Sequence, residues 1–310
     1  MVGREKYLFG PVPSRRLGLS LGVDIVPFKI CTLDCIYCQV GRTTRKTIER
    51  KDYVPVEPVL DELKKRLVQG LRADFITISG SGEPTLNSRL GELIDGIKEI
   101  TDIPVAVLTN GTLLYRQDVQ ADCAKADVVV PSLDAGDDQV FRKINRPHAN
   151  ISIEKLIDGL CAFRNEFDGQ IWLEVFFIDG FNADIGQIAK IKAAIERICP
   201  DKIQLNTAVR PTTEAGLKKV AAVKLEAIAK ELGDKCEVVA DFSPRHCGKN
   251  IESKAEDVLS ILKRRPCSLN DICSGLCIHR NEALKYISHL QQLGVVGSEK
   301  KGGTTFFKVN

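Results

Sequence analysis

The stretch Cys31-Thr32-Leu33-Asp34-Cys35-Ile36-Tyr37-Cys38 brings three thiols together within eight residues. Thiols this close cannot pair with one another as disulfides without strain, but they can converge on one iron–sulfur cluster. A cluster of four irons held by three cysteines leaves one iron open to an outside ligand, which indicates chemistry rather than electron storage. A zinc site and a redox-active thiol pair are the alternatives, although no further Cys or His lies near the triplet to complete a zinc site.

Outward from the triplet, short apolar runs alternate with amphipathic stretches between about residues 17 and 239. The apolar runs predict buried strands at residues 19–26, 75–79, 105–109, 128–132, 171–177, 203–206 and 237–240. Helical patterns lie between them, for example at residues 57–68, at 87–100 with Asn87 as the N-cap, and at 185–198. This alternation predicts an α/β fold with a parallel sheet, either open or closed as a barrel.

Polar motifs follow the predicted strands. The cysteine triplet comes after the first strand, at the sheet edge where parallel α/β folds build their active sites. The later motifs are Gly82-Glu83-Pro84, Thr109-Asn110-Gly111 and Ser132-Leu133-Asp134. Each is by itself common as a turn, a loop start or a helix cap. Because each stands at the carboxyl end of a strand, together they predict a site on the same face as the cysteines.

The spacing CxxxCxΦC, with Tyr37 as the aromatic Φ, resembles the signature of the radical S-adenosylmethionine (SAM) superfamily. The resemblance extends over about residues 9–240. It implies a [4Fe–4S] cluster held by Cys31, Cys35 and Cys38, whose open iron chelates the amino and carboxylate groups of SAM. It also implies that the sheet forms a partial (β/α)6 TIM-like barrel.

The same resemblance implies SAM contacts at the strand ends. The Gly82-Glu83-Pro84 motif is similar to a family motif whose backbone meets the SAM amino group. The strand ends at 109–111 and 132–134 resemble segments that approach the SAM carboxylate and ribose, and residues 174 and 204–206 lie where the family contacts ribose and adenine. The expected cofactor-binding residues are Tyr37, Gly82, Glu83, Asn110, Ser132, Asp134, Glu174 and Leu205.

The activity implied by the resemblance is reductive cleavage of SAM, followed by abstraction of a substrate hydrogen by the 5′-deoxyadenosyl radical. An electron donor such as flavodoxin or ferredoxin is implied as a partner. Residues 10–18 and the Cys-Gln-Val-Gly that ends the cysteine motif look like an Fe–S oxidoreductase subgroup related to wyosine-type tRNA-modifying enzymes. Those enzymes carry additional N-terminal cysteines, whereas this chain has none before Cys31. Arg15 and Arg16 either bind an anionic substrate or pair with carboxylates on the barrel rim.

The strand–helix alternation stops near residue 241. Residues 242–250 contain Pro and Gly without a period and predict a linker. Helices are predicted at 255–263, at 269–275 after an N-cap at Ser268, and at 280–293, followed by a turn and a strand at 304–309. This order is typical of a winged helix-turn-helix domain. We therefore divide the chain into a radical SAM partial barrel, residues 1–245, and a linker with a winged helix, residues 246–310.

Charge is unevenly distributed along the 310 residues. Residues 251–310 hold 9 Lys and Arg against 6 Asp and Glu, a net charge of +3, while the remainder has 35 of each and is neutral. The third helix of the predicted winged-helix domain offers Arg280, Asn281 and Lys285, and the predicted wing offers Lys300 and Lys301. They form a nucleic-acid surface, a protein-docking surface or only a solvated face. An RNA-modifying radical SAM enzyme and an Fe–S, SAM-sensing DNA-binding regulator are therefore the alternatives to a radical SAM enzyme whose substrate the sequence does not reveal.

The chain has 11 cysteines, no apolar leader at its N-terminus and no apolar run long enough for a membrane span. This predicts a cytoplasmic protein with reduced thiols and no membrane partner. Cys247, Cys267, Cys273 and Cys277 either hold a second metal site or pack as small hydrophobic residues. The isolated cysteines are interpreted as packing residues: Cys123, Cys161, Cys199 and Cys236.

Overall fold

The computed structural model describes residues 7–14, 16–240, 255–276, 278 and 280–310 of the chain. Arg15, Cys247 and Cys277, the predicted linker and the predicted domain boundary at 245/246 lie outside these described residues, as does the side chain of Asn281.

An eight-stranded sheet forms the frame of the larger unit in the described part of the chain, and its strands lie side by side in sequence order. The strands are β1 Leu8–Ser14, β2 Gly18–Val23, β5 Phe75–Ile78, β6 Val105–Leu108, β7 Val128–Val130, β8 Gln170–Phe177, β9 Lys202–Thr207 and β10 Cys236–Val238. From β2 to β10 neighbouring strands are parallel, which confirms the predicted α/β fold and its strands.

Strand β1 was not predicted, and it pairs antiparallel with β2 at the edge of the sheet. Gly10 and Pro11 interrupt its apolar pattern. Proline cannot donate to a sheet ladder and is therefore restricted to edge strands, which is the position that β1 takes. Among the described residues, strands β1 and β10 are the two edges, so this sheet does not close into a complete barrel.

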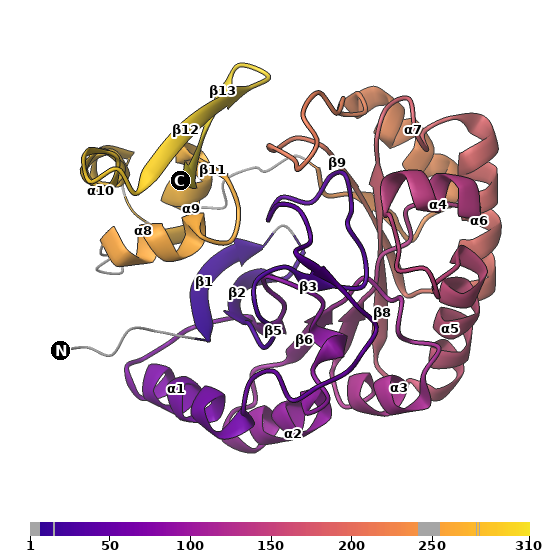
Figure 1. Ribbon diagram of the computed structural model, residues 1–310, viewed down its shortest axis with the longest axis horizontal. Coiled ribbons are helices and arrows are strands. Elements are labelled where there is room, and N and C mark those ends of the chain that lie inside the picture. Colours follow the sequence, from indigo (N-terminus) through magenta and orange to yellow (C-terminus); the bar gives the residue numbers. More distant parts are fainter. Residues whose placement is uncertain (1–6, 15, 241–254, 277, 279) are drawn as a thin grey trace.

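Helices connect successive strands and cover the outer side of the sheet (Figure 1). They are α1 Val56–Val68, α2 Leu90–Ile100, α3 Gln117–Cys123, α4 Asp138–Ile144, α5 Ile153–Glu166, α6 Ile185–Ile198 and α7 Ala222–Leu232. Their apolar faces and the sheet bury a continuous core of Ile, Leu and Val. A second, smaller cluster around Trp172, Val128 and Val130 fills part of the inner face of the sheet.

The predicted N-cap at Asn87 is wrong. A short 3-10 helix, η1 Pro84–Leu86, precedes α2, and Asn87 ends that turn while Arg89 occupies the cap position of α2. The Asn87 amide donates to the carbonyl of Ile25 at 2.9 Å, and its Oδ1 accepts from Arg89 N. Asn87 therefore ties the loop to the end of β2 instead of starting the helix.

A separate C-terminal unit, residues 255–310, has its own apolar core. Its elements are α8 Ala255–Leu262, β11 Cys267–Ser268, α9 Leu269–Leu276, α10 Arg280–Gln292, β12 Val296–Lys301 and β13 Thr304–Val309. The three strands form an antiparallel sheet in the order β11-β13-β12. Ser268 Oγ accepts from Asp271 N at 3.1 Å, so the predicted cap of α9 is confirmed.

The C-terminal unit lies beside β1, on the side of the sheet opposite the arc of α1–α7 (Figure 1). Two groups of contacts tie it to the sheet. Arg264 pairs with Asp24 at the end of β2, and Arg210, shortly after β9, forms a buried ion pair with Asp271 at 2.8 Å. The unit therefore bridges from the β1–β2 edge to the chain leaving β9, across the open side of the partial barrel. No helix in the described part of the chain is both long and apolar enough to cross a bilayer.

Candidate active site

The three cysteines lie on the segment between β2 and α1, which crosses the carboxyl ends of the parallel strands. Cys31 ends the short strand β3 Ile30–Cys31, which pairs with β4 Arg45–Lys46. Two backbone hydrogen bonds fasten this segment to its neighbours: Glu83 N donates to Ile30 O at 3.0 Å, and Ile36 N to Ile144 O at 2.9 Å. The tertiary structure thus holds the cysteine loop against both the Gly82-Glu83-Pro84 turn and the end of α4.

Each of the three thiols accepts a hydrogen bond from a different side chain. The pairs are Lys29 Nζ to Cys38 Sγ at 3.0 Å, Asn110 Nδ2 to Cys31 Sγ at 3.5 Å, and Asn145 Nδ2 to Cys35 Sγ at 3.5 Å. Donors of this kind stabilise sulfur that carries negative charge, as it does when it ligates iron. Sequence reasoning included Asn110 but missed Lys29 and Asn145, because no local motif marks either as a neighbour of sulfur.

The thiol arrangement suits a cluster better than a single ion. Burial raises the pKa of the Cys31 thiol to about 12 and that of Cys35 well above its ordinary value, and a bound cationic centre would favour the thiolate of each. Among the described residues, no three Cys, His, Asp or Glu side chains gather closely enough to share one metal ion. Thiols that each bind a different iron need no such common centre, whereas a zinc site does.

Glu83 is buried, and its carboxylate is occupied by protein donors. It accepts from the N and Oγ1 of Thr85, from Thr109 Oγ1 at 2.6 Å and from Asn110 N at 2.8 Å. The side chain therefore joins the carboxyl ends of β5 and β6 and positions the Asn110 that donates to Cys31. Gly82 permits the close approach of the cysteine loop, because a Cβ there would stand 2.1 Å from Ile30 O.

Asp134 accepts hydrogen bonds from the two aromatic residues of the site and from Asn145. Its Oδ2 accepts from Tyr37 Oη at 2.5 Å and from Asn145 Nδ2 at 2.7 Å, and its Oδ1 accepts from Phe176 N at 2.9 Å. The Tyr37 ring stacks on Phe176 with centroids 4.0 Å apart. Burial raises the pKa of Asp134 to about 6. Asn145 Oδ1 is buried without a hydrogen-bond partner among the described residues, so an acceptor remains available here.

Glu174 lies on β8, and its backbone bridges to Ser132 at the end of β7. Its carboxylate pairs with Arg16 Nη1 at 2.5 Å and accepts from Asn206 Nδ2 at 2.9 Å. Of the two roles predicted for Arg16, the structure shows the ion pair with a carboxylate. Leu205 is fully buried in the core that packs against the helices, so its side chain does not join the other predicted residues.

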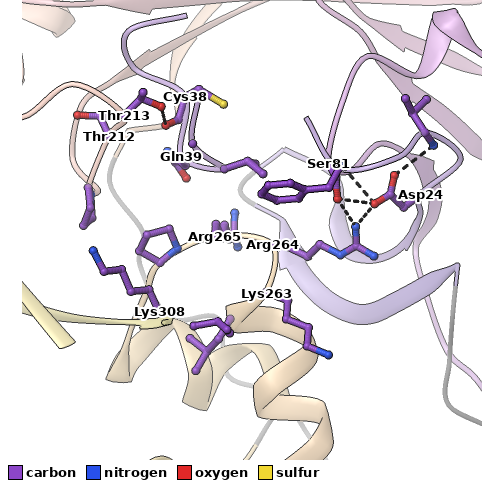
Figure 2. Close-up of a pocket in the computed structure, with 18 of the residues that line it drawn as sticks. Asp24, Cys38, Gln39, Ser81, Thr212, Thr213, Lys263, Arg264, Arg265 and Lys308 are labelled. Atoms are coloured by element: carbon purple, nitrogen blue, oxygen red, sulfur yellow. Dashed lines mark hydrogen bonds and ion pairs between the residues drawn. The ribbon is translucent and has the colours of Figure 1, made fainter. Parts of the chain in front are cut away.

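A cavity of about 770 Å³ opens between the cysteine loop and the C-terminal unit (Figure 2). Cys38 and Gln39 line it from the cysteine loop, and Lys263, Arg264 and Arg265 line it from the C-terminal unit. The candidate site therefore adjoins a cavity that residues of both units line.

The remaining cysteines have mixed surroundings. Cys123 and Cys267 are fully buried, and Cys273 packs partly against the C-terminal core, as expected of small apolar residues. The packing interpretation is wrong for Cys199, which is exposed and follows α6 in a left-handed conformation with φ of 52°. The alternative of a second metal site involves Cys247 and Cys277, which lie outside the described residues.

Comparisons with known proteins agree with this geometry. The family model for the radical SAM superfamily matches residues 25–190. A UPF0026 protein of Methanocaldococcus jannaschii is 32% identical over 97% of this chain and 95% of its own length. A protein named GTPase Obg from Brachyspira hyodysenteriae is 36% identical over 99% of this chain, but this chain spans only 46% of that protein.

Solved structures share the fold at low sequence identity. The crystal structure of Streptococcus suis SuiB bound to S-adenosylmethionine aligns with a TM-score of 0.51 and 15% identity, covering 71% of this chain and 50% of SuiB. A radical SAM methyltransferase from Sphaerobacter thermophilus gives the same TM-score at 17% identity, covering 71% of this chain and 65% of that enzyme. These likenesses show a common α/β partial-barrel architecture.

Proposed function

The chain belongs to the radical SAM superfamily, and on that premise we propose that it abstracts a hydrogen atom from a substrate, with Cys31, Cys35 and Cys38 as its cluster ligands. Membership makes the chain an enzyme with two cofactors, a [4Fe–4S] cluster and SAM. When bound, these groups supply reductive cleavage of SAM and the radical that the cleavage releases. The protein's part is to hold them, orient them and exclude water.

One observation carries this proposal: three thiols of one loop each accept a hydrogen bond from a separate side chain, at the carboxyl edge of a parallel sheet. Anaerobic reconstitution is expected to yield about 4 Fe and 4 sulfide per chain, and reductant plus SAM should give 5′-deoxyadenosine. Cys35→Ser should lose both, whereas Cys161→Ser, at a half-buried cysteine on α5, should keep both. Equal iron content in the two variants would contradict the ligand assignment.

SAM contacts are proposed at the strand ends next to the thiols. Asp134 and Glu174 accept fewer hydrogen bonds from the protein than Glu83 does, so their carboxylates keep acceptor capacity for ribose hydroxyls. Asn145 Oδ1, which has no partner among the described residues, adds an acceptor. Glu83 acts through Asn110 as a positioning residue, since its own oxygens are occupied. Leu205 contributes backbone only. The complete proposed set is Tyr37, Gly82, Glu83, Asn110, Ser132, Asp134, Glu174 and Leu205.

Modification of a nucleotide in RNA is a second candidate within the same chemistry. The C-terminal unit has the order helix, strand, helix, helix and two-stranded wing, which supports a winged helix and a division of the chain near residue 245. Lys301 at the wing tip donates to Arg210 O at 2.7 Å, so this part of the wing contacts the barrel. That contact favours a C-terminal unit that acts together with the barrel in catalysis over one that binds DNA as a regulator. It is compatible with the wyosine-related subgroup.

A direct test of the second candidate is incubation of the reconstituted full-length enzyme with SAM, reductant and unmodified tRNA, followed by mass spectrometry of the nucleosides. A new modified nucleoside supports the candidate, and unchanged tRNA alongside steady 5′-deoxyadenosine formation contradicts it. A cytoplasmic location and an electron donor such as flavodoxin or ferredoxin belong to the proposal as well.

A further inference from the structure

The 770 Å³ cavity between the cysteine loop and the C-terminal unit is large enough for a small organic ligand. Cys38, Gln39 and Gly41 line it on the side of the cysteine loop. The segment from Lys263 to Pro266 lines it on the side of the C-terminal unit, as Figure 2 shows for its labelled residues. A ligand held there lies against the loop that carries the cluster ligands, which is where a substrate of the proposed reaction must approach.

Positive charge exceeds negative charge on the cavity wall. The two acidic side chains of the lining are already paired, Asp24 with Arg264 and Glu299 with Lys308. Lys263 at the rim and Arg265 have no carboxylate partner among the described residues. The surplus charge is suited to an anionic ligand.

Arg265 lines two cavities. It also lines a smaller cavity of about 160 Å³ on the inner face of the sheet, together with Ser20 and Thr77. Burial and the nearby charge of Arg265 lower the pKa of Arg210, whose own charge is already met by Asp271. An anion beside Arg265 would relieve this repulsion between two guanidinium groups.

The rest of the lining is apolar and includes an exposed aromatic ring. Phe28 is 58% exposed although it is a large hydrophobic residue, and Pro27, Pro211 and Pro266 also line the cavity. An aromatic ring and a cation without a carboxylate partner in the lining of one cavity suit a planar base carrying a phosphate, since the ring can stack on the base and the cation can meet the phosphate.

We propose that this cavity is the substrate site of the proposed radical reaction, and that it binds a phosphorylated nucleotide with Arg265 on the phosphate, Phe28 on the base and the exposed Lys263 adding positive charge at the rim. A free nucleotide and a nucleotide within RNA share this chemistry. This arrangement does not use α10, the helix that stands where a winged-helix protein has its recognition helix. The exposed Lys285 lies on α10, which faces away from the sheet (Figure 1).

The test measures binding to the reconstituted full-length enzyme by equilibrium dialysis. The probes are the four ribonucleoside 5′-monophosphates, the matching nucleosides and a single-stranded RNA octamer. Lys263→Gln/Arg265→Gln should weaken binding of the phosphorylated probes about tenfold or more and reduce the salt dependence of octamer binding. The control, Lys285→Gln/Lys300→Gln, removes the same charge from the C-terminal unit outside the cavity and should stay within about twofold of the parent.

Phe28→Leu keeps the charges and removes the ring. We expect it to bind the four monophosphates with equal affinity, about tenfold below that of the parent, because base stacking is lost while the phosphate contacts remain. Tighter binding of the octamer than of any monophosphate identifies RNA as the source of the nucleotide, and the reverse identifies a free nucleotide.

Several outcomes would overturn the cavity assignment: no binding of any phosphorylated probe, equal loss in the control, or equal affinity for nucleosides and nucleotides. Loss of SAM binding in Lys263→Gln/Arg265→Gln would also overturn it, because the cavity would then be the SAM site. Failure of the parent enzyme to form 5′-deoxyadenosine is a separate result that contradicts the proposed function. The substrate-site proposal requires that the Lys263→Gln/Arg265→Gln variant still cleaves SAM when no substrate is present.

Discussion

Lys29 Nζ lies 3.0 Å from Cys38 Sγ, and the lysine is buried with its backbone in the left-handed region at φ of 57°. A non-glycine residue rarely adopts this conformation unless its surroundings hold it there. Lys29 N donates to Ser81 O at 2.8 Å, and Lys29 O accepts from Thr44 N at 3.0 Å. The fold thus fixes an ammonium group beside the third cysteine of the motif.

Replacement of this ammonium group should lower the reduction potential of the cluster. A positive charge near the sulfur favours the reduced state, and a unit charge at this range in a protein environment shifts a one-electron potential by on the order of 100 mV. We expect Lys29→Met to shift the potential downward by about that amount and Lys29→Arg to restore part of it. EPR-monitored redox titration measures the shift. Lys46→Met, at an exposed lysine on β4, is the control, and equal potentials in the two Met variants would contradict the prediction.

Gly82→Ala should displace the cysteine loop. The added Cβ would stand 2.1 Å from the Ile30 carbonyl oxygen, which is backbone and cannot swing aside. Overpacking of this kind costs about 1–3 kcal/mol, so both iron content after reconstitution and the free energy of unfolding should fall. Gly186→Ala, where the nearest atom to the new Cβ is the Asp184 carboxylate at 3.2 Å, should retain full iron content. Retention of iron by Gly82→Ala would show that the loop tolerates the shift.

Asp134 should make stability pH-dependent between about pH 4 and 6. Burial raises the pKa of Asp134 in the folded protein to about 6. The folded protein therefore favours the neutral carboxyl group, and the free energy of unfolding decreases as the pH rises from the unfolded-state pKa of about 4 to the folded-state value. The apoprotein should therefore lose about 2 kcal/mol relative to Asp134→Asn across this range. Urea unfolding of both proteins at several pH values measures the difference. Parallel stability curves would mean that the hydrogen bonds to Asp134 compensate its burial.

Arg210→Met should strongly destabilise the docking of the C-terminal unit. The Arg210–Asp271 pair is buried, with side chains 4% and 8% exposed, and removal of one partner leaves a buried charge at a cost of about 3–5 kcal/mol. Arg197→Ala breaks exposed pairs with Glu154 and Asp158 on the helices and should cost at most about 1 kcal/mol. Thermal unfolding compares the two, and similar melting temperatures would show that Asp271 finds water or another cation.

Much of the site's placement followed from local pattern. Apolar runs predicted the parallel strands because burial on both faces of such a sheet leaves a signal within a few residues. The end of each strand then located the polar motifs at one edge. The same reasoning failed at β1, where Gly10 and Pro11 break the pattern, and at Cys199, whose position after α6 suggested burial although it is exposed.

The sequence by itself determined the α/β class, the cysteine triplet and the edge of the sheet at which it lies, because all three depend on short-range periodicity and spacing. Only the tertiary structure decided which distant groups meet. Arg16 reaches Glu174, 158 residues away, and Asn145 reaches Cys35 from 110 residues away. It also decided that the C-terminal unit encloses a cationic cavity beside Cys38. Such pairings depend on the path of every intervening loop and on the burial of charge, which no local pattern records.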